Sequence, residues 1–249
     1  MADPSRLYGL KALVVNAAGG IGEAVARTLM KHGASVLAID SINSGVEQHF
    51  KPVKGIDGLA ANLTDATRMP ALVETASERL GRIDILVNDF PAQARAPVDD
   101  SSSQLAELIE SRSALIMSVC RSALPQLQKS PAGRIINVGF LRSVFAVDGA
   151  GAFAESENDL ARLTSALAAE TGDFGITANY VQPGAIMTPV SREVFKKDTA
   201  LRDFCIAQSA AKRLGEPVDV AKVVLFLASE DAAFVNGTGI VVDGGRVNS

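Results

Sequence analysis

Short apolar runs alternate with stretches of helical spacing along the whole chain, and this alternation limits the possible folds more than any other feature. Six runs predict buried strands: Leu10–Val15, Ser35–Ile39, Ile83–Val87, Arg134–Val138, Ile176–Val181 and Gly239–Val242. Continuously apolar strands separated by helices are typical of a parallel sheet covered on both faces. Right-handed crossovers then predict a Rossmann-like, doubly wound α/β fold, formed by residues 1–249 as a single domain.

The composition is that of an ordinary globular domain and argues against several kinds of partner. Hydrophobic residues make up 47% of the chain and the net charge is −4, so a large core is expected and nucleic acid is not. Cys120 and Cys205 have no metal-ligand spacing, so we expect no disulfide and no metal site. No apolar run reaches the ~18 residues of a membrane span, and the first residues do not resemble a signal peptide. We therefore expect a cytoplasmic protein without membrane contact.

A glycine-rich turn follows the first predicted strand and suggests a dinucleotide site. It contains Asn16, Gly20, Ile21 and Gly22, and such small residues allow backbone N–H groups to approach a pyrophosphate at a helix N-terminus. Asp40 ends the second strand, where an acidic side chain can accept hydrogen bonds from a ribose and would repel the 2′-phosphate of NADP. The site therefore favours NAD(H), with NADP less favoured. The alternative is a plain tight turn with Asp40 as a helix cap.

These features resemble the short-chain dehydrogenase/reductase family over essentially the whole chain. The family's Thr-Gly-x-x-x-Gly-x-Gly turn corresponds to Val15-Asn16-Ala17-Ala18-Gly19-Gly20-Ile21-Gly22. Its first glycine is replaced by Asn16, which tolerates a left-handed backbone better than most residues. The resemblance implies adenine contacts at Asn62 and Leu63. It also aligns the family's Asn-Asn-Ala-Gly motif with residues 88–91, of which only Asn88 is retained. Phe90 and Pro91 replace small residues there. They either narrow the path of the cofactor or only pack against neighbouring side chains.

The resemblance is closer in the second half of the chain. Pro183, Gly184, Ile186 and Thr188 match the Pro-Gly-x-x-x-Thr segment that holds the nicotinamide carboxamide in the family. Residues 215–217, 225–229 and 242–245 resemble its C-terminal signature. The resemblance therefore implies that NAD(H) binding is possible, although changes elsewhere leave open that it has been lost.

The four positions at which the family keeps its catalytic Asn, Ser, Tyr and Lys are all changed. The alignment implies Arg112 at the Asn position, Phe140 at the Ser position, Phe153 at the Tyr position and Glu157 at the Lys position. A phenyl ring has no dissociable proton, and the loss of a positioned acid or base typically lowers the rate by ~10²–10⁴. Conventional carbonyl reduction or alcohol oxidation is therefore not expected.

The opposite charges of Arg112 and Glu157 suggest that the two side chains form an ion pair in the former active site. One interpretation is a structural bridge over a collapsed pocket. The other gives Glu157 the role of a general base and Arg112 that of an anion clamp in a different reaction. Asp89 also lies at the end of a strand, but an aspartate in a turn is more often structural than catalytic.

Three functions remain open from the sequence. The first is a non-classical or catalytically inactive family member that binds NAD(H) or another small molecule. The second is an enzyme of repurposed, non-redox chemistry built on Glu157 and Arg112. The third is an NAD(H)-dependent oxidoreductase with an unconventional proton donor.

The resemblance also implies an assembly and a lid. It predicts a homo-oligomer, a dimer or tetramer, or a complex with an active relative, through helices at about 102–129 and 151–172. Small and apolar residues such as Ala161, Ala166, Leu167 and Ala168 suit such packing. Residues 185–215 are the least regular part of the sequence and the expected lid over the site.

Overall fold

The computed structural model, which describes residues 6–90, 94 and 96–246, contains a parallel sheet in the order β3-β2-β1-β4-β5-β6-β7. The strands are β1 Lys11–Val15, β2 Ser35–Ser41, β3 Ile56–Ala61, β4 Ile85–Asn88, β5 Arg134–Val138, β6 Thr177–Pro183 and β7 Gly239–Val242. All six predicted strands are confirmed to within a few residues. The strand order reverses between β1 and β4, and ligands of doubly wound sheets bind at the carboxyl ends beside such a point.

Strand β3 was not predicted from the sequence. Its residues, Ile-Asp-Gly-Leu-Ala-Ala, contain one β-branched side chain and a glycine, so they lack the usual composition of a strand. The strand forms because β2 pairs with it along six positions, from Val36–Ile56 to Ser41–Ala61. Gly58 is needed there, since a Cβ atom would lie 2.6 Å from the Val46 carbonyl oxygen of the overlying helix.

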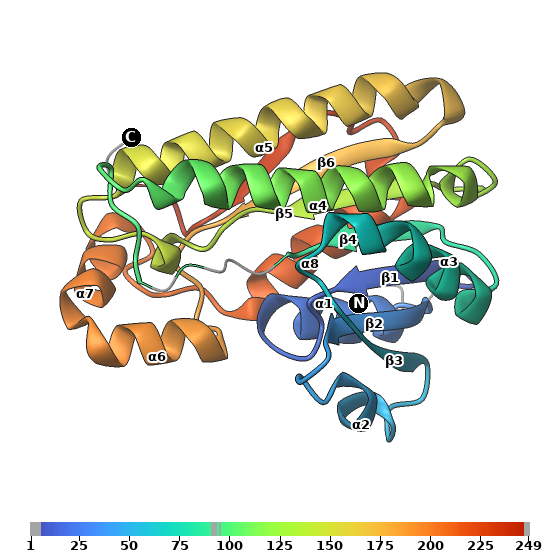
Figure 1. Ribbon diagram of the computed structural model, residues 1–249, viewed down its shortest axis with the longest axis horizontal. Helices are drawn as coiled ribbons and strands as arrows, with labels where there is room; N and C mark the ends of the chain where they lie inside the picture. Colours follow the sequence, from blue (N-terminus) through green and yellow to red (C-terminus); the bar gives the residue numbers. More distant parts are fainter. Residues whose placement is uncertain (1–5, 91–93, 95, 247–249) are drawn as a thin grey trace.

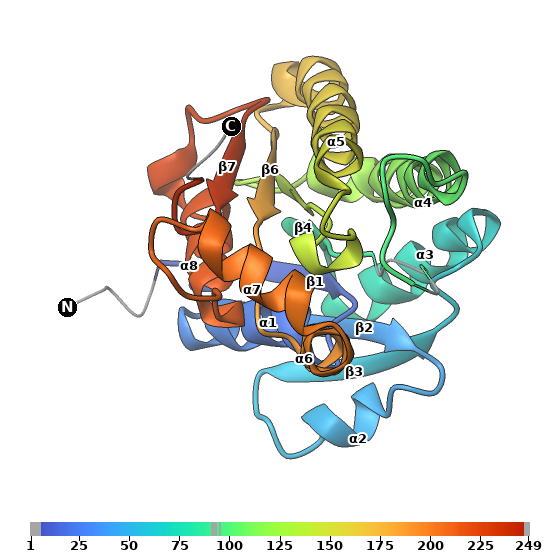
Figure 2. The ribbon, with the colours of Figure 1, turned by 90° about the vertical axis from the view of Figure 1, so that its left-hand side faces the viewer.

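Helices cover both faces of the sheet, as predicted. The helices are α1 Gly20–Lys31, α2 Val46–Phe50, α3 Met69–Leu80, α4 Gln104–Leu127, α5 Ala150–Thr171, α6 Pro189–Lys197, α7 Thr199–Gln208 and α8 Pro217–Ala228. Successive residues of β1 divide between the two faces: Ala12 and Val14 pack with α1 and α8, whereas Leu13 and Val15 pack with α3 and α4. The long helices α4 and α5 lie side by side (Figures 1 and 2).

The segment expected to be an irregular lid contains two helices. Helices α6 and α7 lie together at one end of the molecule (Figure 1), joined by Asp198, which accepts a hydrogen bond from the Leu201 N–H at 2.8 Å. Phe195, Leu201 and Cys205 form a small core of their own beneath them. No helix in the described part of the chain is both long and apolar enough to cross a membrane.

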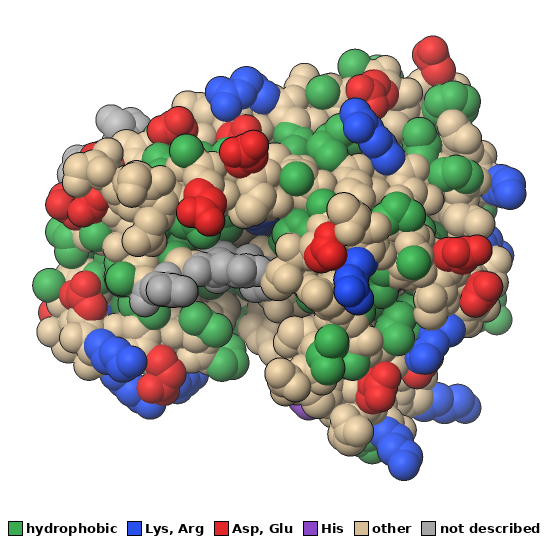
Figure 3. Space-filling view, viewed as in Figure 1, with side chains coloured by type: hydrophobic (Ala, Val, Ile, Leu, Met, Phe, Trp, Pro, Cys, Tyr) green, Lys and Arg blue, Asp and Glu red, His purple; other side chains and the backbone are tan. Residues whose placement is uncertain are grey.

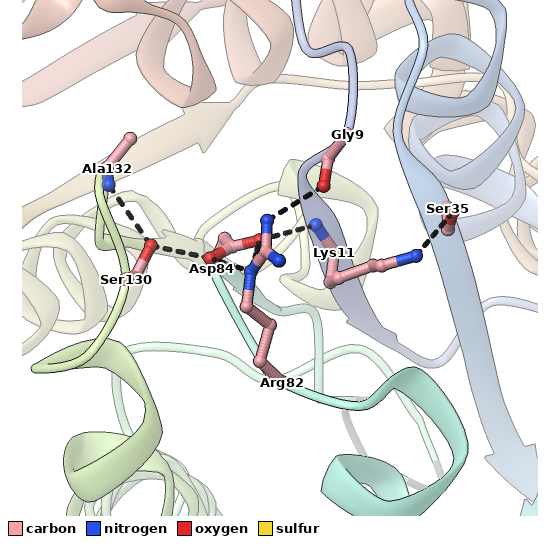
Figure 4. Close-up of polar contacts among 7 residues, drawn as sticks. All are labelled: Gly9, Lys11, Ser35, Arg82, Asp84, Ser130 and Ala132. Atoms are coloured by element: carbon pink, nitrogen blue, oxygen red, sulfur yellow. Dashed lines mark hydrogen bonds and ion pairs between the residues drawn. The ribbon is translucent and has the colours of Figure 1, made fainter.

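Asp84 anchors the amino end of the sheet (Figure 4). Its fully buried carboxylate accepts hydrogen bonds from the Lys11 N–H at 2.8 Å, from Arg82 Nε at 2.9 Å and from Ser130 Oγ at 2.7 Å. Arg82 in turn donates to the Gly9 carbonyl at 2.9 Å. A single carboxylate thus joins the segments that lead into β1, β4 and β5, which fixes the strands whose opposite ends build the site.

Candidate functional site

A cavity of about 820 Å³ opens at the carboxyl ends of the central strands, between the body of the sheet and the α6–α7 lobe. The surface is hollowed beside this lobe in Figure 3. Its volume lies within the range of about 300–1,000 Å³ that is common for small-molecule pockets. The described lining residues are Asn16, Gly19, Gly20, Ile21, Asp89, Phe90, Ala94, Ala96, Pro97, Gly139, Phe140, Leu141, Ser143, Val144, Thr188, Pro189, Val190, Glu193, Val194, Lys197 and Asp198.

The glycine-rich turn contributes the floor of the cavity beside β1. Asn16 adopts φ +61°, so the predicted left-handed backbone at this position is confirmed. Gly22 lies so close to the turn that a Cβ atom would come within 2.0 Å of the Asn16 carbonyl oxygen. Gly20 faces Thr188, whose Cβ would lie 3.4 Å from an added methyl group. Asn16, Gly20 and Ile21 line the cavity, and Gly22 allows the helix to start close to the strand.

Asp40 braces this turn from inside. Its carboxylate accepts hydrogen bonds from the Ala18 N–H at 2.7 Å and from the Ser41 N–H at 2.6 Å, and the residue is only 6% exposed. Both oxygens therefore already accept hydrogen bonds from backbone N–H groups, one in the turn before α1 and one in β2, and neither bond caps a helix. Each oxygen keeps further acceptor capacity, so contact with a ribose remains a prediction.

The two residues expected near adenine serve the chain's own structure. Asn62 accepts hydrogen bonds from the Thr64 N–H at 2.9 Å and from Thr64 Oγ1 at 2.8 Å. Leu63 is 2% exposed and packs in the core on the α3–α4 side of the sheet. Any ligand contact at Leu63 would have to come from its backbone.

Asn88 belongs to a buried polar chain across the sheet. Its side-chain amide donates to Asn137 Oδ1 at 2.9 Å and approaches Cys120 Sγ at 3.4 Å. Asn137 then donates to Thr164 Oγ1 at 3.1 Å on α5. The network holds β4, β5 and α5 in register, and Asn88 itself is not among the described residues that line the cavity.

The Thr188 segment forms the opposite wall. Thr188 caps α6 by accepting a hydrogen bond from the Ser191 N–H at 3.1 Å, and the Ser191 hydroxyl lies 2.8 Å from that of Thr188 and 3.0 Å from that of Ser143. Pro183 is in β6 and Ile186 is buried. Gly184 permits close packing, because a Cβ atom would lie 2.6 Å from that of Asp243. Of this predicted group, only Thr188 lines the cavity.

Phe140 and Phe153, at the expected Ser and Tyr positions, belong to one aromatic cluster. Phe145 lies between them, with ring centroids 6.3 Å from Phe140 and 5.3 Å from Phe153 in edge-on geometry. Phe153 is 4% exposed, and the guanidinium groups of Arg142 and Arg246 lie 5.7 and 5.2 Å from its ring centroid. Phe140 reaches the cavity wall, but Phe153 does not, so the ring at the Tyr position packs in the protein interior.

The predicted ion pair between Arg112 and Glu157 is wrong. Arg112 is buried and donates a hydrogen bond to the Val138 carbonyl oxygen. Its Cζ atom lies 4.3 Å from the ring centroid of Phe140, over the face of the ring. Glu157 instead pairs with Arg246, whose Nη2 lies 2.8 Å from Glu157 Oε2. The partner of Glu157 comes from the segment after β7, which local spacing along the sequence cannot reveal. Neither residue is among the described cavity-lining residues.

Asp89 is a titratable group in the wall of the cavity. It follows β4 directly and lines the cavity, and the Asn16 side chain and the Gly22 N–H lie near enough to lower its pKa. Burial raises the pKa of Asp89 to about 6, an effect that the nearby Arg112, Asn16 and Gly22 oppose and that Asp40 strengthens. Burial also lowers the pKa of Arg112 to about 10, against the pull of Asp89 and Asp159. The position of Asp89 after a central strand was the one available signal.

The site fits a dinucleotide only in part. The turn geometry and Thr188 suit it, and Asp40 retains acceptor capacity for a ribose. A diphosphate would lie against the N-terminal N–H groups of α1, and the Asp89 carboxylate lies near one of these donors, that of Gly22. Two anions at one helix end repel each other, so the diphosphate does not fit beside ionised Asp89.

Comparison with known proteins gives the family. A family model described as enoyl-(acyl carrier protein) reductase matches residues 16–246. The 3-oxoacyl-[acyl-carrier-protein] reductase FabG of Vibrio cholerae is 31% identical over 241 residues, covering 96% of this chain and 98% of that protein. Oxidoreductase UcpA of Escherichia coli is 29% identical over 251 residues, covering 96% and 95%. The chain belongs to the short-chain dehydrogenase/reductase family.

A solved structure supports the same assignment. A protein of Agrobacterium tumefaciens, provisionally assigned as a gluconate dehydrogenase, superposes with a TM-score of 0.85 at 27% sequence identity, with complete coverage of both chains. The framework that carries oxidoreductase sites in this family is thus present from end to end.

Proposed function

We propose that this chain is a non-classical member of the family that binds a small molecule in the cavity and does not transfer hydride through the family's Asn, Ser, Tyr and Lys residues. The observation that carries the proposal is the buried packing of Phe153 against Phe145 and two guanidinium groups. A buried phenyl ring at the expected Tyr position supplies no proton. Glu157 is held by an ion pair with Arg246. Arg112 is held by its hydrogen bond to Val138 and by the ring of Phe140.

The cavity lining supports an uncharged, largely apolar ligand. Phe90, Pro97, Phe140, Leu141 and Val144 supply apolar surface. Apolar walls with a few placed polar groups are typical of small-molecule sites. The hydroxyl groups of Ser143 and Thr188 lie in that wall.

Two finer properties belong to the same proposal. Among nicotinamide dinucleotides, we expect NAD(H) to be preferred over NADP(H), because Asp40 would repel a 2′-phosphate. We also expect a homo-oligomer. Of the α5 residues predicted to form its interface, Leu167 and Ala168 are buried in the core of the chain itself. Ala166 is exposed and Ala161 is partly exposed, so these two are available for contact with another subunit. Light scattering on the purified protein measures the assembly.

One observation favours a second candidate function, that of an oxidoreductase with an unconventional proton donor. Ser143, Ser191 and Thr188 form a chain of buried hydroxyl groups that reaches the cavity. Such a chain is a proton path that an oxidoreductase with an unconventional donor would use. The geometry does not support a repurposed reaction that uses Glu157 and Arg112 together, because Glu157 pairs with Arg246 and Arg112 binds the Val138 carbonyl oxygen.

The test is a turnover assay on the full-length protein. Acetoacetyl-CoA with NADH or NADPH represents the 3-oxoacyl reductases, and gluconate with NAD or NADP represents the gluconate dehydrogenases, with Vibrio cholerae FabG as positive control for the former. We expect rates below those of the control by at least ~10², the lower end of the loss of an acid/base group. Wild-type turnover within tenfold of the control would overturn the proposal, and loss of that turnover in Ser143→Ala would favour the hydroxyl chain.

A gain-of-function variant gives a second measurement. Arg112→Asn, Phe140→Ser, Phe153→Tyr and Glu157→Lys together restore the residue types of the family. Because a lysine at position 157 would face Arg246, we expect turnover to appear only when Arg246→Ala accompanies all four changes, provided that circular dichroism shows the protein folded. The wild-type assay decides the proposal alone if this variant does not fold.

A further inference from the structure

Helix α1 begins without a capping side chain of its own. Gly19 is its N-cap residue, and no side chain at that position accepts a hydrogen bond. The first bond of the helix joins the Glu23 N–H to the Gly19 carbonyl at 3.2 Å, so the N–H groups of Gly20, Ile21 and Gly22 have no acceptor within the helix. Together with the helix dipole, such groups favour an anion.

The chain supplies that anion from a different strand. Asp89 follows β4, which pairs directly with β1, so the carboxyl ends of the two strands bring it to the turn that starts α1. The Gly22 N–H and the Asn16 side chain both lower the pKa of its carboxyl group, so the carboxylate lies near them. Asp89 shares the cavity wall with Gly19, Gly20 and Ile21, so it lies where a diphosphate would approach this helix.

Charges on neighbouring elements act on Asp89 in both directions. Asp40 on β2 repels it, and Arg112 on α4 attracts it while also interacting with Asp159 of α5. Arg112 forms no ion pair within 4.0 Å among the described residues, and its Nε is buried without a hydrogen-bond partner. Across the cavity, the described lining adds Glu193 and Asp198 as acids and Lys197 as a base.

We propose that Asp89 is a specificity-determining residue that acts as a built-in anion at the phosphate-binding end of α1, so that dinucleotides bind weakly while it is ionised and more tightly when it is protonated. The cavity then selects uncharged ligands at neutral pH. Burial raises the pKa of Asp89 to about 6, which places the change within an accessible pH range. The inference concerns binding and does not depend on the proposed absence of turnover.

The experiment is calorimetric titration of the full-length protein with NAD at pH 8.0 and at pH 5.5. We expect wild-type affinity to be at least about tenfold higher at pH 5.5, since even one screened charge contact near a diphosphate is worth about 1.4 kcal/mol or more. Asp89→Asn, which keeps an acceptor oxygen for Gly22, should bind NAD at pH 8.0 at least about tenfold more tightly than wild type and lose most of the pH dependence.

A matched variant controls for charge alone. Asp57→Asn removes an exposed carboxylate of β3 that is not among the described residues lining the cavity, and it should bind NAD as wild type does at both pH values. The proposal is overturned if Asp89→Asn, shown to be folded, binds NAD no more tightly than wild type at pH 8.0. It is also overturned if wild-type affinity is equal at the two pH values. Either result leaves the turnover assay unaffected.

Discussion

Nη2 of Arg246 lies 2.8 Å from Oε2 of Glu157, so the segment after β7 is fastened to α5. The same guanidinium lies 5.2 Å from the ring centroid of Phe153. The pair is partly exposed, at 37% for Arg246 and 17% for Glu157, so water weakens it. A lysine restored at position 157 would therefore face an arginine rather than a vacant site.

The first prediction follows from this pair. Glu157→Lys should destabilise the protein by about 1 kcal/mol, because it replaces a partly exposed attraction by a repulsion. Arg246→Glu added to Glu157→Lys should recover most of this loss. Urea unfolding of the four proteins in a double-mutant cycle measures the coupling. Additive effects would mean that the two side chains do not interact in solution.

The second prediction concerns the aromatic cluster. Phe145 is completely buried and meets both Phe140 and Phe153, so Phe145→Ala should lower the free energy of unfolding by about 3–5 kcal/mol. Phe174→Ala is the control, because that ring is 53% exposed. Its change should stay within about 0.5 kcal/mol. Equal losses in the two variants would contradict the packing described for the cluster.

The sequence predicts the fold because six strands carry continuous apolar runs, but it does not predict β3. That strand depends on pairing with β2 and on close contact between Gly58 and α2, neither of which leaves an apolar run. In the site, the backbone of Asn16 was predictable because few residues adopt its conformation. The partner of Glu157 was not, because Arg246 is separated from it by 89 residues and approaches only in the folded chain.

The third prediction concerns the amino end of the sheet. Asp84→Ala leaves the Lys11 N–H, Arg82 and Ser130 without their shared acceptor, so it should cost about 3–5 kcal/mol, the range for breaking a buried charged pair. Asp84→Asn keeps one acceptor oxygen and should cost less. Denaturant unfolding compares both with Asp57→Asn, whose exposed partner is Arg79. A loss in Asp84→Ala as small as that of this control would exclude the anchoring role.

The fourth prediction concerns the cysteines. Burial raises the pKa of the Cys120 thiol to about 12 and that of the Cys205 thiol to about 11, and only the thiolate is nucleophilic. Neither thiol should react with Ellman's reagent within minutes at pH 8 in the folded protein. Both should react once guanidinium chloride has unfolded it. Prompt reaction of one thiol in the native protein would show that its surroundings open readily.

The last prediction is the effect of Asp89 on stability. Its folded-state pKa of about 6 lies above the ordinary value of 3.8, so between these values the folded chain binds more protons than the unfolded chain. The free energy of unfolding therefore falls as the pH rises through this window, and the full destabilisation by ionised Asp89 is present above about pH 7.

Asp89→Asn removes this charge. Its melting temperature should exceed that of wild type by about 5 °C at pH 8, from a penalty of roughly 2–3 kcal/mol. The two proteins should converge near pH 4, whereas Asp57→Asn should follow wild type throughout. A difference that stays constant between pH 4 and pH 8 would mean that Asp89 titrates as an ordinary surface carboxylate, and the electrostatic argument for dinucleotide selection would fail with it.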